Sequence, residues 1–193
     1  MRYPNGKQYN VESTKTKKTT RGILNAGNRG MNLESDINLS NEYYNEINKC
    51  LVTKRPTPIN IVKVDYSRGA KITDAYFEKQ STTDYNGVYK GKYLDFEAKS
   101  TQNKTSFPLS NITLHQIDHL KRVINHGGIA FFIIEFTKVS EVYLLDASYV
   151  IDFYLNGDRK SIPYLTIKEV GTLIKQGLRP RLDYLAAVEE KYF

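Results

Sequence analysis

The sequence predicts a mixed α/β fold in which a central β-sheet is flanked by helices, and three features carry this prediction. Residues 129–136 form an almost unbroken apolar run, typical of a strand buried on both faces. Residues 82–99 have the pattern of two strands around a Lys90-Gly91 turn. Residues 31–50 carry apolar side chains at roughly helical spacing, as a helix packed on a sheet does.

The length of 193 residues suits one domain, and we expect a basic, flexible N-terminal arm at 1–30 followed by a single domain at 31–193. The arm holds seven basic residues and one acidic residue, so it supplies about +6 of the formal net charge of +7. This charge favours contact with nucleic-acid phosphates, through Lys17, Lys18 and Arg21. A solvated tail without a role is the alternative.

Cys50 is the chain's one cysteine, so no disulfide can form within the chain. No apolar run near the N-terminus is long enough for a signal peptide or a membrane span. We therefore expect a cytoplasmic protein with no membrane partner.

The helix predicted at 31–50 has Glu34 in its first turn. A carboxylate there interacts favourably with the helix dipole, and this is the simpler interpretation. The alternative is that Glu34 supports a metal site, either behind the direct ligands or on a second metal ion.

Residues 54–80 predict a hairpin arm with strands at 59–66 and 71–77. Basic and aromatic residues are interleaved along it, which suits phosphate contact combined with stacking on unpaired bases. The expected DNA contacts are Lys54, Arg55, Arg68, Lys71, Tyr76, Phe77 and Lys79. We expect Phe77 to act as a wedge, and the alternative is a surface hairpin whose aromatic side chains belong to the core.

The hairpin at 82–99 carries the candidate chemistry: Asp84, then Glu97 thirteen residues later, then Lys99. Carboxylates are hard oxygen ligands suited to Mg²⁺ or Mn²⁺, and a neighbouring lysine can orient a water or neutralise a scissile phosphate. This combination indicates a divalent-metal nuclease centre. An ordinary exposed strand with alternating charges is the alternative.

Strand alternation puts Glu97 and Lys99 on one face of this hairpin, with Leu94 and Phe96 on the other. We expect the apolar face to pack into the core and the charged pair to point outward into a cleft. Asp95 shares the charged face but lies nearer the turn, so we predict an exposed carboxylate there rather than a metal ligand.

A helix is predicted at 111–125, and Gln116 lies on it, where its amide oxygen can reach a metal-bound water or align Lys99. His115 and His119 resemble a zinc pair, but no cysteine or Glu-x-x-His partner accompanies them, so surface or phosphate-facing histidines are favoured. The remaining elements predicted are a strand at 141–145 and helices at 147–154, 166–175 and 185–192.

Seven stretches of sequence, spread over essentially the whole chain, form one ordered pattern. They are Arg29-Gly30-Met31 with Leu33-Glu34, Lys54-Arg55-Pro56-Thr57-Pro58, Ala75-Tyr76-Phe77, residues 81–99, residues 103–109, His115-Gln116-Ile117 and residues 180–184. With this pattern the chain resembles the RecU family of Holliday junction resolvases. Thr83 precedes Asp84 where the broader nuclease class often has proline, which is usual for the RecU-like pattern.

The resemblance implies a homodimeric, Mg²⁺-dependent endonuclease, with Mn²⁺ as the alternative ion, that cuts four-way DNA junctions symmetrically in recombination and repair. It also implies a restriction-endonuclease-like core of the PD-(D/E)xK class, a projecting hairpin stalk that enters the junction, and modulation of the RecA recombinase. The implied catalytic residues are Asp84, Glu97 and Lys99. The implied metal-site residues are Thr82, Asp84, Glu97 and Gln116.

Two other functions remain open at this stage. A restriction-type endonuclease with the same centre would cut linear duplex without a junction. A non-catalytic protein that binds junctions or a recombinase would carry the acidic and basic residues incidentally. A resolvase would act at the nucleoid.

Overall fold

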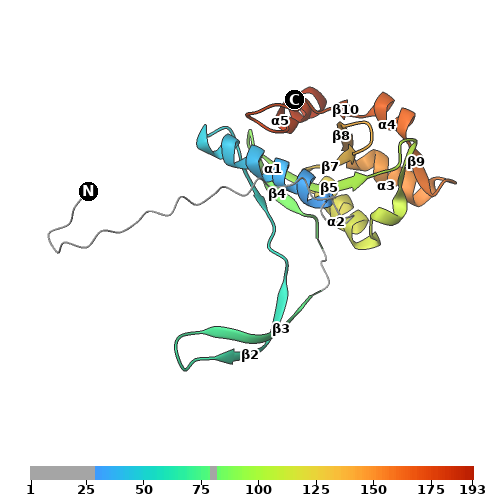
Figure 1. Cartoon of the computed structure of the whole chain (residues 1–193). Coiled ribbons are helices and arrows are strands. Elements are labelled where there is room, and N and C mark those ends of the chain that lie inside the picture. The colour runs from blue at the N-terminus through green and yellow to red at the C-terminus, as the bar shows by residue number, and fades with distance from the viewer. Residues whose placement is uncertain (1–28, 79–81) are drawn as a thin grey trace, which may run out of the picture.

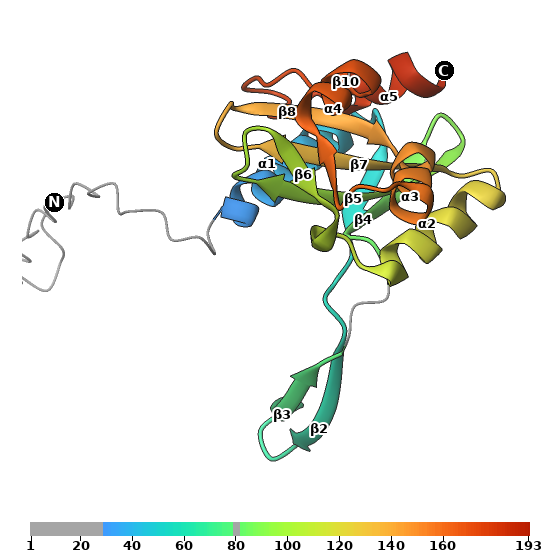
Figure 2. The same cartoon turned by 90° about the vertical axis from the view of Figure 1, so that its right-hand side faces the viewer.

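The computed structural model describes residues 29–78 and 82–193, and its centre is a six-stranded sheet with helices on both faces (Figures 1 and 2). β5 and β7 pair in parallel, and the other neighbouring strands pair antiparallel. The strands, in their order across the sheet, are β1 (Leu51–Lys54), β4 (Tyr85–Tyr89), β5 (Lys92–Thr101), β7 (Ile129–Phe136), β8 (Glu141–Asp146) and β10 (Thr172–Leu173). The predicted mixed α/β fold is therefore confirmed.

Two apolar cores sit on opposite faces of this sheet. Along β7, Phe131 and Ile133 belong to one core, whereas Phe132 and Ile134 belong to the other. The first core is covered by α1 (Arg29–Glu46) and α5 (Tyr184–Tyr192). The second is covered by α2 (Leu114–Asn125), α3 (Ala147–Asn156) and α4 (Tyr164–Val170) (Figure 2). A strand covered on both sides must be apolar on both, which explains the unbroken run in β7.

The β4–β5 hairpin forms as predicted. Lys90 and Gly91 have φ values of 47° and 73°, the left-handed pair that a tight two-residue hairpin turn requires. In the strands, the Phe96 ring stacks between Tyr85 and Phe131, with ring centroids 4.9 and 4.6 Å away. This stack fixes the register of β5 against its neighbours.

Three helix boundaries differ from the prediction by three residues or more. The first helix ends at Glu46 rather than near Cys50, and residues 109–111 form a short 3₁₀ turn, η2 (Leu109–Asn111), before α2 begins at Leu114. The helix predicted at 166–175 is α4, which ends at Val170, and β10 follows it. Gly171 has extended backbone angles, and a Cβ there would be 2.7 Å from the Ile167 carbonyl oxygen and 3.1 Å from that of Leu144 in β8. The chain turns there against β8, which prevents further helix.

A small sheet of β6 (Ser106–Pro108) and β9 (Ser161–Pro163) completes the domain.

The predicted hairpin arm projects from the body of the molecule (Figure 1). It consists of β2 (Ile59–Asp65) and β3 (Lys71–Phe77), an antiparallel pair separate from the central sheet, and we call it the stalk. Every residue of β3 is exposed, and the exposed fractions of Tyr76 and Phe77 are 60% and 78%. The alternative that these rings belong to the core is therefore wrong.

Some predictions concern residues that the structure does not describe. The N-terminal arm, with Lys17, Lys18 and Arg21, lies outside the described residues, and so does Lys79. Among the helices of the described chain, none has the length and apolar character needed to cross a membrane.

Candidate active site

Three polar residues, Asp95, Glu97 and Lys99, lie on the face of β5 that is turned toward α2. The residues between them point into the first core, so the prediction that Glu97 and Lys99 share a face is confirmed. The expectation that the pair points outward is wrong for Glu97, which is 0% exposed. The side chain of Lys99 keeps 24% of its surface exposed. Sequence alternation identified the face, but it did not show that α2 covers it.

The Glu97 carboxylate is held by three donors from three parts of the chain. Its Oε1 accepts from Lys99 Nζ at 2.7 Å and from Gln116 Nε2 at 2.5 Å. Its Oε2 accepts from the backbone N–H of Asp84 at 3.1 Å. The carboxylate therefore has a fixed orientation, with a cation beside it at the edge of the buried region.

Asp84 is brought to the same place by backbone contacts. It directly precedes β4, and its carbonyl accepts from the N–H of Arg55 at 2.7 Å. Its Oδ2 accepts from the N–H of Ala98 at 3.4 Å, which sets the Asp84 carboxylate beside the strand that carries Glu97. The structure thus brings together Asp84, Glu97 and Lys99, which are thirteen and two residues apart in the sequence.

Gln116 contacts this cluster through its amide nitrogen. It is the third residue of α2, and its Oε1 accepts from the N–H of Thr113 at 2.9 Å in a capping box. Because a backbone N–H can only donate, the amide oxygen faces the start of the helix and the amide nitrogen faces Glu97. The oxygen that we expected near the metal caps the helix instead, and Gln116 orients the Glu97 carboxylate.

Glu97 is a weaker acid than an ordinary glutamate. Burial raises the pKa of Glu97 to about 8, Lys99 opposes this rise, and the Asp84 carboxylate adds to it. Two carboxylates held together in a buried site favour a cation between them. Among the described residues no group of three or more His, Cys, Asp or Glu side chains is placed to hold a metal ion, so the cluster offers two carboxylates, those of Asp84 and Glu97. Mg²⁺ suits such a set because it usually binds one or two carboxylates and keeps several waters. Thr82, half-buried two residues before Asp84, is a further oxygen donor nearby in sequence.

The raised pKa of Glu97 predicts that metal affinity depends on pH. In the metal-free protein Glu97 is protonated below about pH 8, and a cation that bound through its carboxylate would have to displace that proton. The apparent affinity for Mn²⁺ should therefore rise by up to about tenfold per pH unit below pH 8 and level off above it. Calorimetric titration with Mn²⁺ from pH 6 to 9 measures this rise. An affinity that stays constant over this range contradicts it.

Asp95 was predicted to be exposed, and this is wrong, since it is 0% exposed. Burial alone would raise the pKa of Asp95, but hydrogen bonds from His119, Thr83 and Tyr93 and the charge of Arg55 hold it below its ordinary value. We missed this cluster in the sequence. Two signals were present: Asp95 shares the face of Glu97, and His119 lies three residues after Gln116, on the same side of α2.

The remaining candidate residues near the site have protein partners. His119 was expected at the helix surface or facing phosphate, but its side chain is only 23% exposed and its Nε2 lies 2.9 Å from Asp95 Oδ2. Glu34 lies in the second turn of α1 rather than the first, and its carboxylate pairs with Lys54 Nζ at 2.5 Å. The guanidinium of Arg55, expected to contact DNA, is bound to Asp95 at 2.7 Å.

Comparison with known proteins gives four findings. Residues 28–190 match the family described as RecU, recombination protein U. A protein of Bacillus cytotoxicus, the Holliday junction resolvase RecU, is 54% identical over 202 residues, which cover 100% of this chain and 98% of that protein. The protein of the same name in a Geobacillus species is 52% identical over 199 residues, with the same coverage. Among solved structures, Archaeoglobus fulgidus Hjc, a Holliday junction resolvase, aligns with a TM-score of 0.44 at 10% identity, covering 74% of this chain and 94% of that one.

Proposed function

The chain belongs to the RecU family, and from that membership we propose that it is a Holliday junction resolvase, an endonuclease that makes paired metal-dependent cuts in four-way DNA junctions. The observation that carries the proposed chemistry is the contact of buried Glu97 with Lys99 and with the backbone of Asp84. Full-length identity above 50% to the two resolvases supports the substrate.

We propose that Asp84 and Glu97, with Thr82 near them, hold Mg²⁺ or Mn²⁺. A divalent cation supplies Lewis-acid stabilisation of the phosphate charge and lowers the pKa of the attacking water. The contribution of Gln116 is to keep Glu97 oriented by the hydrogen bond from its amide nitrogen. Lys99, whose side chain is largely covered, stabilises the negative charge that develops on the phosphate, and its ammonium is effective because little water screens it.

We propose that the stalk recognises the four-way junction by binding at its centre. Within the part of the chain that the structure describes, its Tyr76 and Phe77 rings are largely exposed, while a four-way junction offers unpaired or poorly stacked bases at its centre. Arg68 and Lys71 add positive charge where β2 turns into β3. Phosphate contact by these cations and stacking by Phe77 would hold the junction open against the active site.

Substitution of Phe77 by Ala tests this role. Base stacking on an aromatic ring is worth about 1–3 kcal/mol, so junction cutting should fall by about 10- to 100-fold in Phe77→Ala. Single-turnover cleavage of a labelled junction measures the loss. The matched control is Phe193→Ala, which removes another exposed ring, at the C-terminus, and should cut like the wild type. An unchanged rate in Phe77→Ala contradicts the wedge role.

A homodimer follows from the symmetry of the substrate. A four-way junction has two equivalent strands to cut, and a two-fold dimer presents two equivalent active sites. We propose this assembly together with action on cytoplasmic, nucleoid DNA and contact with the RecA recombinase, as the family resemblance implies. Chromatography with light scattering tests the dimer, with twice the mass of the 22.2 kDa chain as the expected result.

Cleavage of a synthetic four-way junction and of a linear duplex of the same sequence tests the proposed function. We expect cutting of the junction with Mg²⁺, none with EDTA, and little cutting of the duplex. Equal cutting of the duplex would indicate a general endonuclease. Tight junction binding without any metal-dependent cutting would indicate a binding protein.

A further inference from the structure

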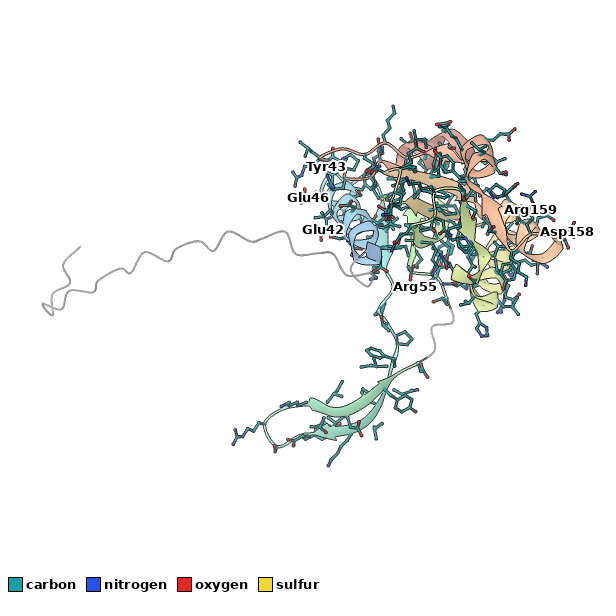
Figure 3. All side chains as sticks on the ribbon, turned by 45° about the vertical axis from the view of Figure 1, so that its right-hand side comes forward. Glu42, Tyr43, Glu46, Arg55, Asp158 and Arg159 are labelled. Carbon is teal, nitrogen blue, oxygen red and sulfur yellow. The ribbon has the colours of Figure 1, made fainter. Side chains whose placement is uncertain are left out.

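Arg55 lies at the root of the stalk, where the chain leaves the body of the molecule (Figure 3). It follows β1 directly, and three residues separate it from β2, whereas Thr83 lies where the chain has returned from β3 and is about to enter β4. The two ends of the stalk are therefore marked by these two residues. Neither belongs to the proposed metal ligands.

Asp95 joins the two ends. It is fully buried, and its carboxylate accepts from four side chains in different parts of the fold. Its contacts are Arg55 Nη2 at 2.7 Å, Tyr93 Oη at 2.8 Å, His119 Nε2 at 2.9 Å and a hydrogen bond from Thr83 Oγ1. We call Arg55, Thr83, Tyr93, Asp95 and His119 the root cluster.

The guanidinium of Arg55 bridges most of the cluster. Nη1 donates to Thr83 Oγ1 at 2.9 Å, and Nη2 donates to both Asp95 and Tyr93. The side chain of Arg55 is only 18% exposed. A planar guanidinium with several fixed donors suits binding to several partners at once. Because these donors are already used within the cluster, few remain for a DNA phosphate.

The root cluster is continuous with the active site on two sides. The backbone N–H of Arg55 holds the carbonyl of Asp84, and Thr83 is the residue before Asp84. Asp95 lies two residues before Glu97, on the same face of β5. The cluster thus fixes the segment that carries one proposed ligand to the strand that carries the other.

We propose that Arg55 and Asp95 are positioning residues that set Asp84 against Glu97 and tie the root of the stalk to the cutting step. Arg55 acts on metal binding and on the rate of cutting, and it makes no energetically important contact with DNA. This inference rests on the proposed function and assigns a role that the metal ligands and Lys99 do not fill.

The test uses the double variant Arg55→Gln with Asp95→Asn, which removes both charges and so leaves no unpaired ion in the interior. Outer partners of metal ligands typically contribute about 10- to 100-fold to metal affinity or activity, and we expect Mn²⁺ affinity without DNA and single-turnover junction cutting each to fall in this range. The dissociation constant for the junction should stay within about twofold, with an unchanged salt dependence, because no phosphate contact is lost. Arg179→Gln, the same change at an exposed arginine paired with Glu46, is the matched control and should match the wild type in all three measurements.

Two results would overturn the inference. One is wild-type Mn²⁺ affinity together with a wild-type cutting rate. The other is a loss confined to junction affinity, with the salt slope reduced by about one, which would make Arg55 a phosphate contact. Thr83→Val, which removes a single hydroxyl at nearly constant volume, repeats the test if the double variant does not fold, and it should lower Mn²⁺ affinity without weakening junction binding. A wild-type protein that cuts no junction would overturn the proposed function, whereas the Mn²⁺ measurement, made without DNA, would still decide the inference.

Discussion

Substitution of Glu97 by Gln is expected to reduce metal-dependent junction cutting by about 10³-fold or more, because Glu97 is a proposed metal ligand and such a ligand contributes several kcal/mol to the stability of the transition state. The amide has nearly the same shape as the carboxylate, but it carries no charge. Its nitrogen would also face donors that now bind the carboxylate, Lys99 Nζ among them. Junction affinity should stay within about twofold, because Glu97 is buried and the proposed DNA contacts lie elsewhere. Single-turnover cleavage with binding measured in parallel separates the two effects.

A surface carboxylate provides the control for this variant. Glu190→Gln makes the same chemical change at an exposed residue of α5 and should cut like the wild type.

Thermal stability gives a second test of the state of Glu97. The folded-state pKa of Glu97 is raised to about 8, above its unfolded value, so its contribution to stability is fully present below the unfolded pKa and is lost progressively as the pH rises to about 8. The metal-free wild type should therefore lose more thermal stability between pH 6 and 9 than Glu97→Gln. Cutting by Glu97→Gln within tenfold of the wild type would contradict the metal-ligand role.

Lys99→Met is expected to slow cutting by about 10²- to 10³-fold, the usual consequence of removing one group that stabilises transition-state charge. The ammonium lies 2.7 Å from Glu97 but is not itself a metal ligand, so the loss should persist at saturating Mn²⁺. A variant of a metal ligand would instead recover activity, at least in part, when Mn²⁺ is saturating. A loss that high Mn²⁺ restores would assign Lys99 to metal binding rather than to the reaction.

Two further variants make the Lys99 test specific. Lys99→Arg keeps the charge and should recover part of the rate. Lys92→Met removes an exposed lysine from the start of the same strand and should cut like the wild type. Equal losses in Lys92→Met and Lys99→Met would mean that a general reduction of positive charge causes the effect.

Much of the fold follows from local patterns in the sequence. The apolar run of β7, the left-handed turn at Lys90 and Gly91, and the period of two in β5 each have one favourable structure. The predictions that failed concern places where contacts between segments far apart in the sequence determine the structure. The helix predicted at 166–175 stops at Gly171 because β8 passes close to that backbone, and β8 is more than twenty residues away in the chain.

The active site shows the same division. Strand alternation correctly put Glu97 and Lys99 on one face, but alternation does not say whether a face is covered. Asp95 was predicted to be exposed because it lies near a turn, and it is buried because α2 and Arg55 come from distant parts of the sequence to cover it. The orientation of Gln116 could have been anticipated, since Thr113 and Gln116 form the capping-box pattern that directs the amide oxygen to the helix start.

Cleavage of a four-way junction whose two equivalent strands carry different labels tests the central claim most directly. With Mg²⁺, the account predicts cuts at symmetric positions in both labelled strands, at equal rates, and none in the presence of EDTA or in Glu97→Gln. Cuts in one strand alone, cuts at unrelated positions, or equal cutting of the matching linear duplex would contradict the assignment of this protein as a junction resolvase.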